Sequence, residues 1–292
     1  MKLCIFLLRL IFIAIVSNLL YYVYYLTIQS FDFKNFPHYL LVCIILTTEE
    51  SFSSRAVTVW QTYAKKCDRV VFACNCSNFD KNKNYTDMPI LQLNITEDYN
   101  KMDKKVLTTL NDAYSMYSEP YYWFLLVDDD TYVFADNARR FISKLKGSEP
   151  LTYGYNYKIT VAQGYHSGGG GTLFTPESIK RIVASIRVGK CNESVGFGDI
   201  MLGLCSEKSN VTMGNSLDEF GRERFHPLTL KNHYLETDRF SLGFYSSNEA
   251  KFGKECCSEQ SITFHYVSKE EMIEYSKIND ESDLTVIYNK LQ

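Results

Sequence analysis

The sequence is poor in residues that break regular structure, with only 6 Pro and 15 Gly among 292 residues. At 46% hydrophobic and 15% aromatic residues, this composition excludes a disordered or fibrous chain, and the length suits one large domain or two small ones. Positive charge is also scarce: the net charge is −3, and −5 (29 Lys and Arg against 34 Asp and Glu) without the N-terminal Lys2 and Arg9. A mildly acidic body lacks the basic surface that nucleic acid requires, so no nucleic-acid partner is expected.

Charge is nearly absent from the N-terminal segment, where Leu10 to Ile28 forms an uncharged run of 19 residues. As a helix this run would span about 28 Å, the thickness of one hydrocarbon core. We therefore expect a cytoplasmic tail and the start of an anchor at residues 1–9, a transmembrane signal anchor at 10–28 and a short stem at 29–38. A cleaved signal peptide is the alternative, disfavoured by the length of the run and by the lack of a small-residue cleavage motif.

Two further patterns agree with export of everything after the anchor. Eight of the nine cysteines lie beyond it, and the sequence has no Cys-x-x-Cys pair or Cys/His cluster with zinc spacing. Disulfide bonds are therefore favoured over metal binding. Five Asn-x-Ser/Thr sequons are candidate glycosylation sites, at Asn75, Asn84, Asn94, Asn192 and Asn210.

Apolar runs alternate with helical patterns in the first half of the exported part. Strands are predicted at 39–46, 69–73, 90–93 and 121–127, and helices at 51–66, 102–117 and 137–146, with a polar loop at 75–87. This alternation predicts an α/β fold with a parallel sheet. Ligands of such sheets bind beyond the carboxyl ends of the strands.

Three consecutive carboxylates, Asp128, Asp129 and Asp130, follow the most apolar predicted strand. Their mutual repulsion is relieved by a cation, and hard divalent ions that bridge diphosphates prefer oxygen ligands. The alternative is a solvated acidic turn that caps the next helix. Placement at the end of a buried strand favours a metal–diphosphate site.

A glycine run, Gly168 to Gly171, lies further along the chain. Glycines allow a substrate to approach the backbone, and no Gly-Lys-Ser/Thr sequence follows to make a P-loop. A flexible loop or bulge before a strand at 172–174 is equally compatible with the run.

These motifs and several later ones resemble the core 1 β1,3-galactosyltransferase branch of the β1,3-glycosyltransferases (glycosyltransferase family 31), which also include Fringe. The matching segments run through most of the exported part: Trp123-Phe124-Leu125, Asp128 to Val133, Gln163-Gly164-Tyr165, Ser167-Gly168-Gly169, Gly221-Arg222-Glu223, Phe225-His226-Pro227, Cys256-Cys257-Ser258 and Phe264 to Val267. The resemblance implies an α/β fold of the GT-A (Rossmann-like) type in one lumenal catalytic domain, residues 39–292. It also implies a single-pass type II membrane protein of the Golgi, and relatives that are often homodimers.

The resemblance further implies an inverting transfer of galactose from UDP-galactose to GalNAc α-linked to Ser or Thr of glycoproteins. Mn²⁺ on the donor diphosphate would be held by Asp128, Asp130 and His265. Residues implied in donor binding are Asp128, Asp129, Gly169, Gly170 and Tyr266.

By the same resemblance Asp199 is the catalytic base that takes the acceptor's proton. The alternative is a helix N-cap aspartate. The family's acidic Glu-Asp pair is broken here, because Gly198 stands in place of the Glu. The sequence also has fewer aromatics at Ser241 to Tyr245 and carries Tyr63 where the family has Trp, which we interpret as conservative packing.

The family pattern pairs six cysteines as Cys43 with Cys67, Cys191 with Cys205, and Cys256 with Cys257. Cys74 and Cys76 remain, and they could bond to each other or to a second subunit. Two other functions stay open. One is a Fringe-like transferase that uses another UDP-sugar, such as UDP-GlcNAc, and the other is a non-catalytic chaperone or lectin-like relative. The intact acidic triplet favours an enzyme.

Overall fold

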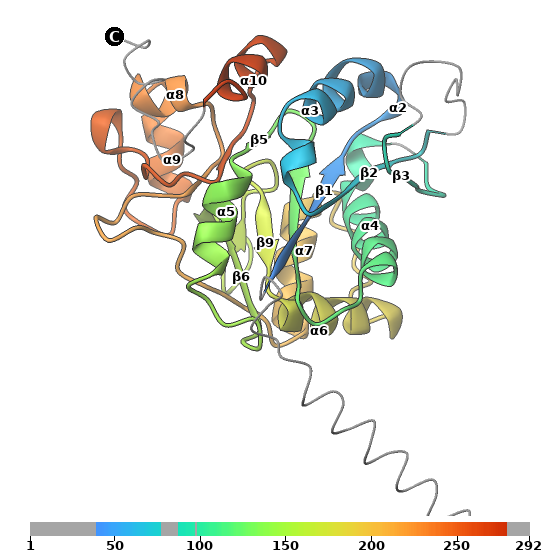
Figure 1. The fold of residues 1–292 in the computed structure, drawn as a ribbon. Helices are drawn as coiled ribbons and strands as arrows, with labels where there is room; N and C mark the ends of the chain where they lie inside the picture. Colours follow the sequence, from blue (N-terminus) through green and yellow to red (C-terminus); the bar gives the residue numbers. More distant parts are fainter. Residues whose placement is uncertain (1–38, 77–86, 97, 279–292) are drawn as a thin grey trace, which may run out of the picture. The chain divides into compact units, whose positions relative to one another are not determined.

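The computed structural model describes residues 39–76, 87–96 and 98–278 (Figure 1). The chain divides at His38 into two units, and all described residues belong to the second, Tyr39–Gln292. The anchor expected at residues 10–28 and the sequon at Asn84 lie outside the described residues. Within the described ranges no helix is long and apolar enough to cross a membrane.

A seven-stranded sheet forms the centre of this unit, in the strand order β10-β6-β9-β4-β1-β2-β3. Neighbours β3, β2, β1 and β4 are parallel, as predicted, whereas β9 is antiparallel to both β4 and β6. The strands are Leu40–Leu46 (β1), Arg69–Cys74 (β2), Ile90–Gln92 (β3), Tyr122–Asp128 (β4), Leu151–Gly154 (β6), Thr172–Phe174 (β9) and Thr212–Met213 (β10).

Both faces of the sheet are covered by helices (Figure 1). Alternate residues of β1 point to opposite faces: Cys43 packs on the side of α3 and α5, and Ile44 on the side of α4, α6 and α7. This two-sided burial explains why the strand is apolar throughout. These helices are Val57–Gln61 (α3), Met102–Met116 (α4), Ala135–Ile142 (α5), Pro176–Arg187 (α6) and Gly198–Lys208 (α7).

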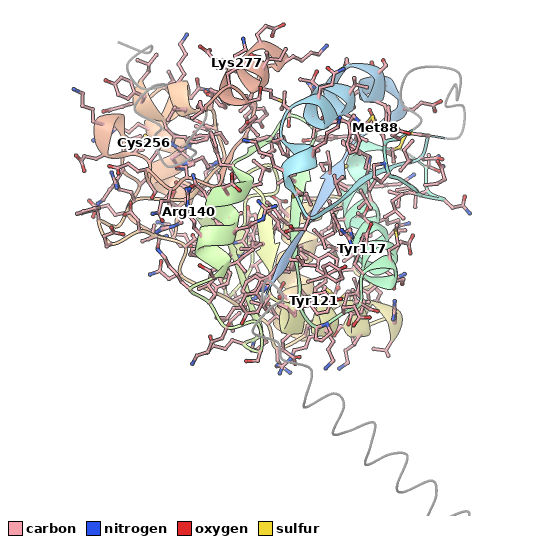
Figure 2. The ribbon with its side chains drawn as sticks, viewed as in Figure 1. Met88, Tyr117, Tyr121, Arg140, Cys256 and Lys277 are labelled. Carbon is pink, nitrogen blue, oxygen red and sulfur yellow. A yellow bond between two sulfur atoms is a disulfide. The ribbon has the colours of Figure 1, made fainter. Side chains whose placement is uncertain are left out.

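Aromatic rings close the end of the sheet at which β1 and β4 begin. Tyr117, at the end of α4, and Tyr121 both contact Tyr122, with ring centroids 5.6 and 4.8 Å apart (Figure 2). Tyr39 meets Trp123 edge-on at 5.6 Å. The opposite end, where these strands finish, is therefore the one left for polar residues.

Two small sheets lie beside the main one. One has the order β11-β12-β5 and the other pairs β7 with β8. The strands are Tyr132–Val133 (β5), Asn156–Tyr157 (β7), Tyr165–His166 (β8), Phe225–His226 (β11) and Thr263–Phe264 (β12), and the remaining short helices are Glu49–Ser51 (α2), Leu230–Tyr234 (α8), Arg239–Tyr245 (α9) and Lys269–Tyr275 (α10).

Two predicted helices differ from those observed. The helix expected at 51–66 is broken into α2, a π-helical turn Phe52–Ala56, α3 and a 3₁₀ turn Ala64–Lys66. Hydroxyls bond back to carbonyls along it, from Thr58 to Ser54 at 2.8 Å and from Thr62 to Thr58 at 2.7 Å, and such bonds bend helices. The helix expected at 137–146 is α5, which begins two residues earlier and ends at Ile142.

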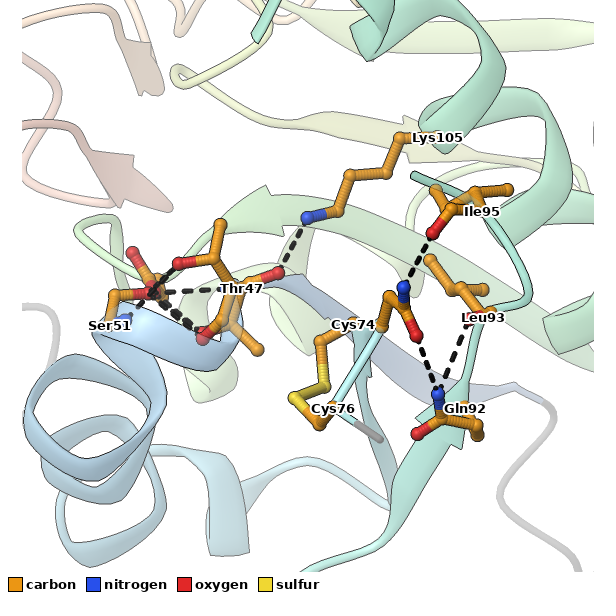
Figure 3. Close-up of a disulfide and its surroundings, with 11 residues drawn as sticks. Thr47, Ser51, Cys74, Cys76, Gln92, Leu93, Ile95 and Lys105 are labelled. Atoms are coloured by element: carbon orange, nitrogen blue, oxygen red, sulfur yellow. Dashed lines mark hydrogen bonds between the residues drawn. A yellow bond between two sulfur atoms is a disulfide. The ribbon is translucent and has the colours of Figure 1, made fainter. Parts of the chain in front are cut away.

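All three family-like disulfides are present: Cys43–Cys67, Cys191–Cys205 and Cys256–Cys257. The leftover cysteines bond to each other, Cys74 to Cys76, at the end of β2 (Figure 3). This pairing resolves the alternative that the sequence left open. Each of the eight cysteines from Cys43 onward is bonded within this chain.

Candidate active site

The site lies where β1 and β4 end, side by side in parallel register with Leu46 opposite Asp128. Two adjoining cavities open there. The first, about 430 Å³, is lined by Asp199 among others, and we call it the Asp199 cavity. The second, about 610 Å³, is lined by the acidic triplet and is called the acidic cavity. They share Asp128, His265 and Tyr266, so the two form one site with two compartments.

The acidic triplet and the late histidine come together as the family resemblance implies. Nε2 of His265 lies 3.1 Å from a carboxylate oxygen of Asp130 and 3.8 Å from one of Asp128. One ligand atom from each of the three residues lies within 4.8 Å of the others. Two carboxylates and an imidazole form a donor set that suits Mn²⁺.

The electrostatics of this group fit a cation site. Burial raises the pKa of Asp128 to about 6, although the charge of His265 opposes the rise. Burial acts in the same way on Asp130, but the hydrogen bond and charge of His265 outweigh it and lower the pKa. Burial disfavours the charged form of His265, yet the pKa of this histidine is raised because Asp130 and Asp128 stabilise its proton. The two carboxylates therefore favour a positive charge at the position of the His265 ring.

Asp129 and Tyr266 complete the acidic cavity. Asp129 is buried and accepts hydrogen bonds from the hydroxyls of Thr47, at 2.7 Å, and Ser51. Tyr266 is 59% exposed, stacks on His265 with ring centroids 3.7 Å apart and adopts a left-handed backbone with φ of 57°. A non-glycine residue in that region carries backbone strain, which is common at binding sites.

The glycine run packs against both His265 and Asp199. A Cβ at Gly169 would lie 2.0 Å from the His265 ring, and a Cβ at Gly168 would lie 3.3 Å from the Cβ of Asp199. Glycine is therefore required at Gly169 by the histidine that packs against it. Gly170 is turned away from both cavities, and its carbonyl accepts a hydrogen bond from Thr263 at 2.5 Å. Gly169 lines the Asp199 cavity and Gly170 does not.

Asp199 lies in the first turn of α7, two residues after the N-cap Phe197, so it is not itself the N-cap. Burial raises its pKa above the ordinary value even though backbone N–H groups of Ile200 and Gly168 hydrogen-bond to the carboxylate. A raised pKa makes a carboxylate a stronger base.

Three residues at the site were not predicted. Arg55 lies 3.5 Å from Asp129 and 3.4 Å from Asp130, and its side chain is half exposed to the acidic cavity. Lys105 is buried and donates to the carbonyl of Thr47 at 2.6 Å (Figure 3). Tyr63, assigned to packing, donates its hydroxyl to the carbonyl of Thr131 at 2.8 Å and so also holds the acidic turn. Lys105 had a signal in the sequence, since it occupies a core position of a helical pattern.

The described residues contain one other group with metal-ligand spacing, His226, His233 and Cys257. Its sulfur is already bonded to Cys256, so no thiolate is offered. The Asp128, Asp130 and His265 group remains the candidate metal centre of the described part.

Comparison with known proteins agrees with this geometry. The Galactosyltransferase family matches residues 76–166. A glycoprotein-N-acetylgalactosamine 3-beta-galactosyltransferase 1 from Xenopus laevis is 30% identical over 236 residues, which cover 80% of this chain and 64% of that protein. The chain is thus similar to a galactosyltransferase over most of its length. This confirms the resemblance drawn from the motifs, and the chain spans about two thirds of the length of that relative.

Another group of relatives is named for the transfer of a different sugar. A beta-1,3-glucosyltransferase from Mus musculus is 31% identical over 97 residues, covering 32% of this chain and 19% of that protein. A solved glycosyltransferase involved in the glycosylation of the major capsid of PBCV-1 covers 82% of this chain and 100% of its own, with a TM-score of 0.40 and 12% identity.

Proposed function

We propose that this galactosyltransferase relative is an inverting β1,3-galactosyltransferase that moves galactose from UDP-galactose to GalNAc α-linked to Ser or Thr. The observation that carries the proposal is the two-compartment site. A candidate metal group and a buried carboxylate with a raised pKa line adjoining cavities that share Asp128, His265 and Tyr266. A two-substrate transfer needs this arrangement, with the donor in one compartment and the acceptor in the other.

In the proposed reaction Asp199 takes the proton of the acceptor 3-hydroxyl while that oxygen bonds to C1 of the sugar. The bond from C1 to the diphosphate breaks on the opposite face, and UDP leaves with the electron pair, so the anomeric centre inverts. Arg55, half exposed beside Asp129 and Asp130, is positioned to neutralise a diphosphate oxygen. Lys105 adds a buried positive charge to the same cavity.

Mn²⁺ fits this site because Asp128, Asp130 and His265 offer two oxygens and one nitrogen at converging positions. When bound, the ion would offset the negative charge that develops on departing UDP. The intact group also argues against a non-catalytic chaperone or lectin-like function, which would not need it.

The proposal extends to the fold type and location implied by the family. We propose a GT-A catalytic domain at residues 39–292, held in the Golgi by the anchor at 10–28 after a tail at 1–9 and stem at 29–38. Acceptors would be O-GalNAc glycoproteins, and the protein would act as a homodimer. Protease protection of the exported part in sealed Golgi vesicles, lost on adding detergent, tests the topology.

The activity is tested with purified protein, Mn²⁺, a GalNAc-peptide and a panel of UDP-sugars. Transfer of galactose in β1,3 linkage is expected, and no transfer from any donor would refute the proposal. Similarity to a beta-1,3-glucosyltransferase keeps a second candidate, transfer of another sugar, in the same panel. Transfer from UDP-glucose or UDP-GlcNAc alone would support that candidate.

A further inference from the structure

The segment leading into Asp199 is held by a buried carboxylate from another helix. Asp103, the second residue of α4, is 1% exposed. One of its oxygens accepts hydrogen bonds from the backbone N–H groups of Val195, at 3.0 Å, and Gly196, at 3.1 Å. Its other oxygen accepts from the N–H of Lys104 at 2.7 Å. A carboxylate that receives three backbone N–H groups is firmly held in its charged form.

The same segment fits closely against the start of α4, which packs on α7 (Figure 1). Gly196 has φ of +78°, and a Cβ there would lie 3.1 Å from the carbonyl oxygen of Asn100. A Cβ at Gly198 would lie 2.7 Å from a methyl of Val106. Because glycine has no side chain, these two residues allow the backbone to pack against the start of α4. Asp199, whose carboxylate lines the Asp199 cavity, follows directly.

We propose that Asp103 is a positioning residue for Asp199, a role that rests on the proposed function of Asp199 as the base. Asp103 fixes the two peptide N–H groups that precede Phe197 and thereby sets where α7 begins. Phe197 is 57% exposed and its helix has no side-chain N-cap bond, so α7 itself does little to hold this end. A general base must lie within hydrogen-bond reach of the proton it takes, so a shift of about 1 Å costs on the order of 10²-fold in rate.

The test compares Asp103→Ala and Asp103→Asn in the full chain, with Asp112→Ala as a control on the same helix. Asp112 accepts a hydrogen bond from Asn111 and lies further along α4 than Asp103, away from Val195 and Gly196. We expect Asp103→Ala to lower kcat on the order of 10- to 100-fold, with KM for the UDP-sugar within about twofold of wild type. Asp103→Asn keeps an oxygen acceptor and should recover most of the rate. The control should match wild type.

A purely structural role is distinguished by the pH profile of kcat. Tyr157 and Tyr165, whose raised pKa keeps them neutral, lie near Asp199. The other titratable side chains that line the same cavity are Tyr99, Asp128, Asp238, Tyr245, His265 and Tyr266. Freeing the segment exposes Asp199 to water and so shifts the acid limb of kcat to lower pH in Asp103→Ala. An unmoved acid limb, or an Asn variant as slow as the Ala variant, would overturn the proposal.

A second measurement is independent of activity. Hydrogen exchange of the Val195 and Gly196 amides should speed up in Asp103→Ala and stay slow in Asp112→Ala; equal protection in both overturns the proposal. If the Ala variant does not fold, Asp103→Ser, which suits the first turn of a helix, takes its place. Failure of the wild-type protein to transfer any sugar would instead count against the proposed function, since the exchange result stands without it.

Discussion

At the scale of single residues, Asp199 carries the most specific prediction. Asp199→Asn keeps the size of the side chain but removes its basicity, so kcat should fall by about 10² to 10⁴ with little change in donor binding. Because burial raises the pKa of Asp199, the protonated and inactive form persists to higher pH than for an ordinary aspartate. The rate should therefore fall on acidification through a midpoint above the pKa of an ordinary aspartate. Full turnover by Asp199→Asn at saturating Mn²⁺ would contradict the assignment.

Steric contacts in this chain explain why Gly198 stands where the family's acidic pair has Glu. A Cβ there would lie 2.7 Å from Val106 and 3.2 Å from the carbonyl oxygen of Met102, so the family's Glu does not fit against this α4. Gly198→Ala should destabilise the protein by about 1–3 kcal/mol in denaturant unfolding. Adding Val106→Ala should recover part of the stability lost to the clash.

Gly243 in α9 is the matched control, because no atom lies within 4 Å of a Cβ placed there. Gly243→Ala should be neutral or stabilising by up to about 1 kcal/mol. An equal loss of stability at both glycines would point to a general effect of helix substitution and count against the contact with α4.

The sequence was most informative about residues in linear motifs. Asp128, Asp130 and His265 meet as the motifs imply, although more than 130 positions separate the histidine from the triplet. Arg55 was not predicted, because a single basic residue on an exposed part of a helix has no linear signature. Lys105 shows only its core position in a helical pattern, and its role depends on the carbonyl of Thr47 that it faces. The alternative that Asp199 is a helix N-cap is wrong, because the N-cap of α7 is Phe197, two residues earlier.

At the scale of elements, buried parallel strands were predictable and short paired ones were not. The runs at β1 and β4 are apolar along their length because both faces are covered, and that pattern is visible in one sequence. The sheet β11-β12-β5 consists of two-residue strands, which are too short to show any period. It is nonetheless the element that brings His265, directly after β12, to the acidic turn before β5.

The end of β2 gives a prediction about glycosylation. The Nδ2 of Asn75, where a glycan would attach, donates to the carbonyl of Ile95 at 2.7 Å, and its Oδ1 accepts from Gln92 at 3.0 Å (Figure 3). The adjacent Cys76 is locked to Cys74. In protein expressed through the secretory pathway we expect no glycan on Asn75 and a glycan on the exposed Asn192.

Intact-mass analysis of two variants checks this prediction. Asn192→Gln should lose the mass of one glycan, whereas Asn75→Gln should change the mass only by the substitution. A glycopeptide containing modified Asn75 would show that the hydrogen bonds to Ile95 and Gln92 do not protect this side chain.

At the scale of the whole described unit, the site joins parts that are distant in sequence. The strands β1 and β4 and the segment after β12 reach the wall that the two cavities share, and the glycine run and the start of α7 line the Asp199 cavity beside it. Because no single stretch of sequence contains the site, the composition could limit the possible fold classes but could not locate the site. A ligand that touches this wall should therefore stabilise the unit as a whole, because it binds groups that come together only on folding.

We therefore expect cooperative stabilisation by UDP and Mn²⁺, which is measurable without any sugar transfer. At a concentration of about 100 times Kd, a ligand that binds only the folded state adds about 2.7 kcal/mol, which raises Tm by roughly 5–10 °C for a unit of this size. UDP in the presence of a chelator should give a much smaller shift, because the acidic triplet then repels the diphosphate. His265→Ala removes the nitrogen ligand and should lose most of the joint shift, whereas Lys144→Ala, an exposed control that lines neither cavity, should keep it. An equal shift by UDP with and without Mn²⁺ would mean that Arg55 and Lys105 alone hold the diphosphate.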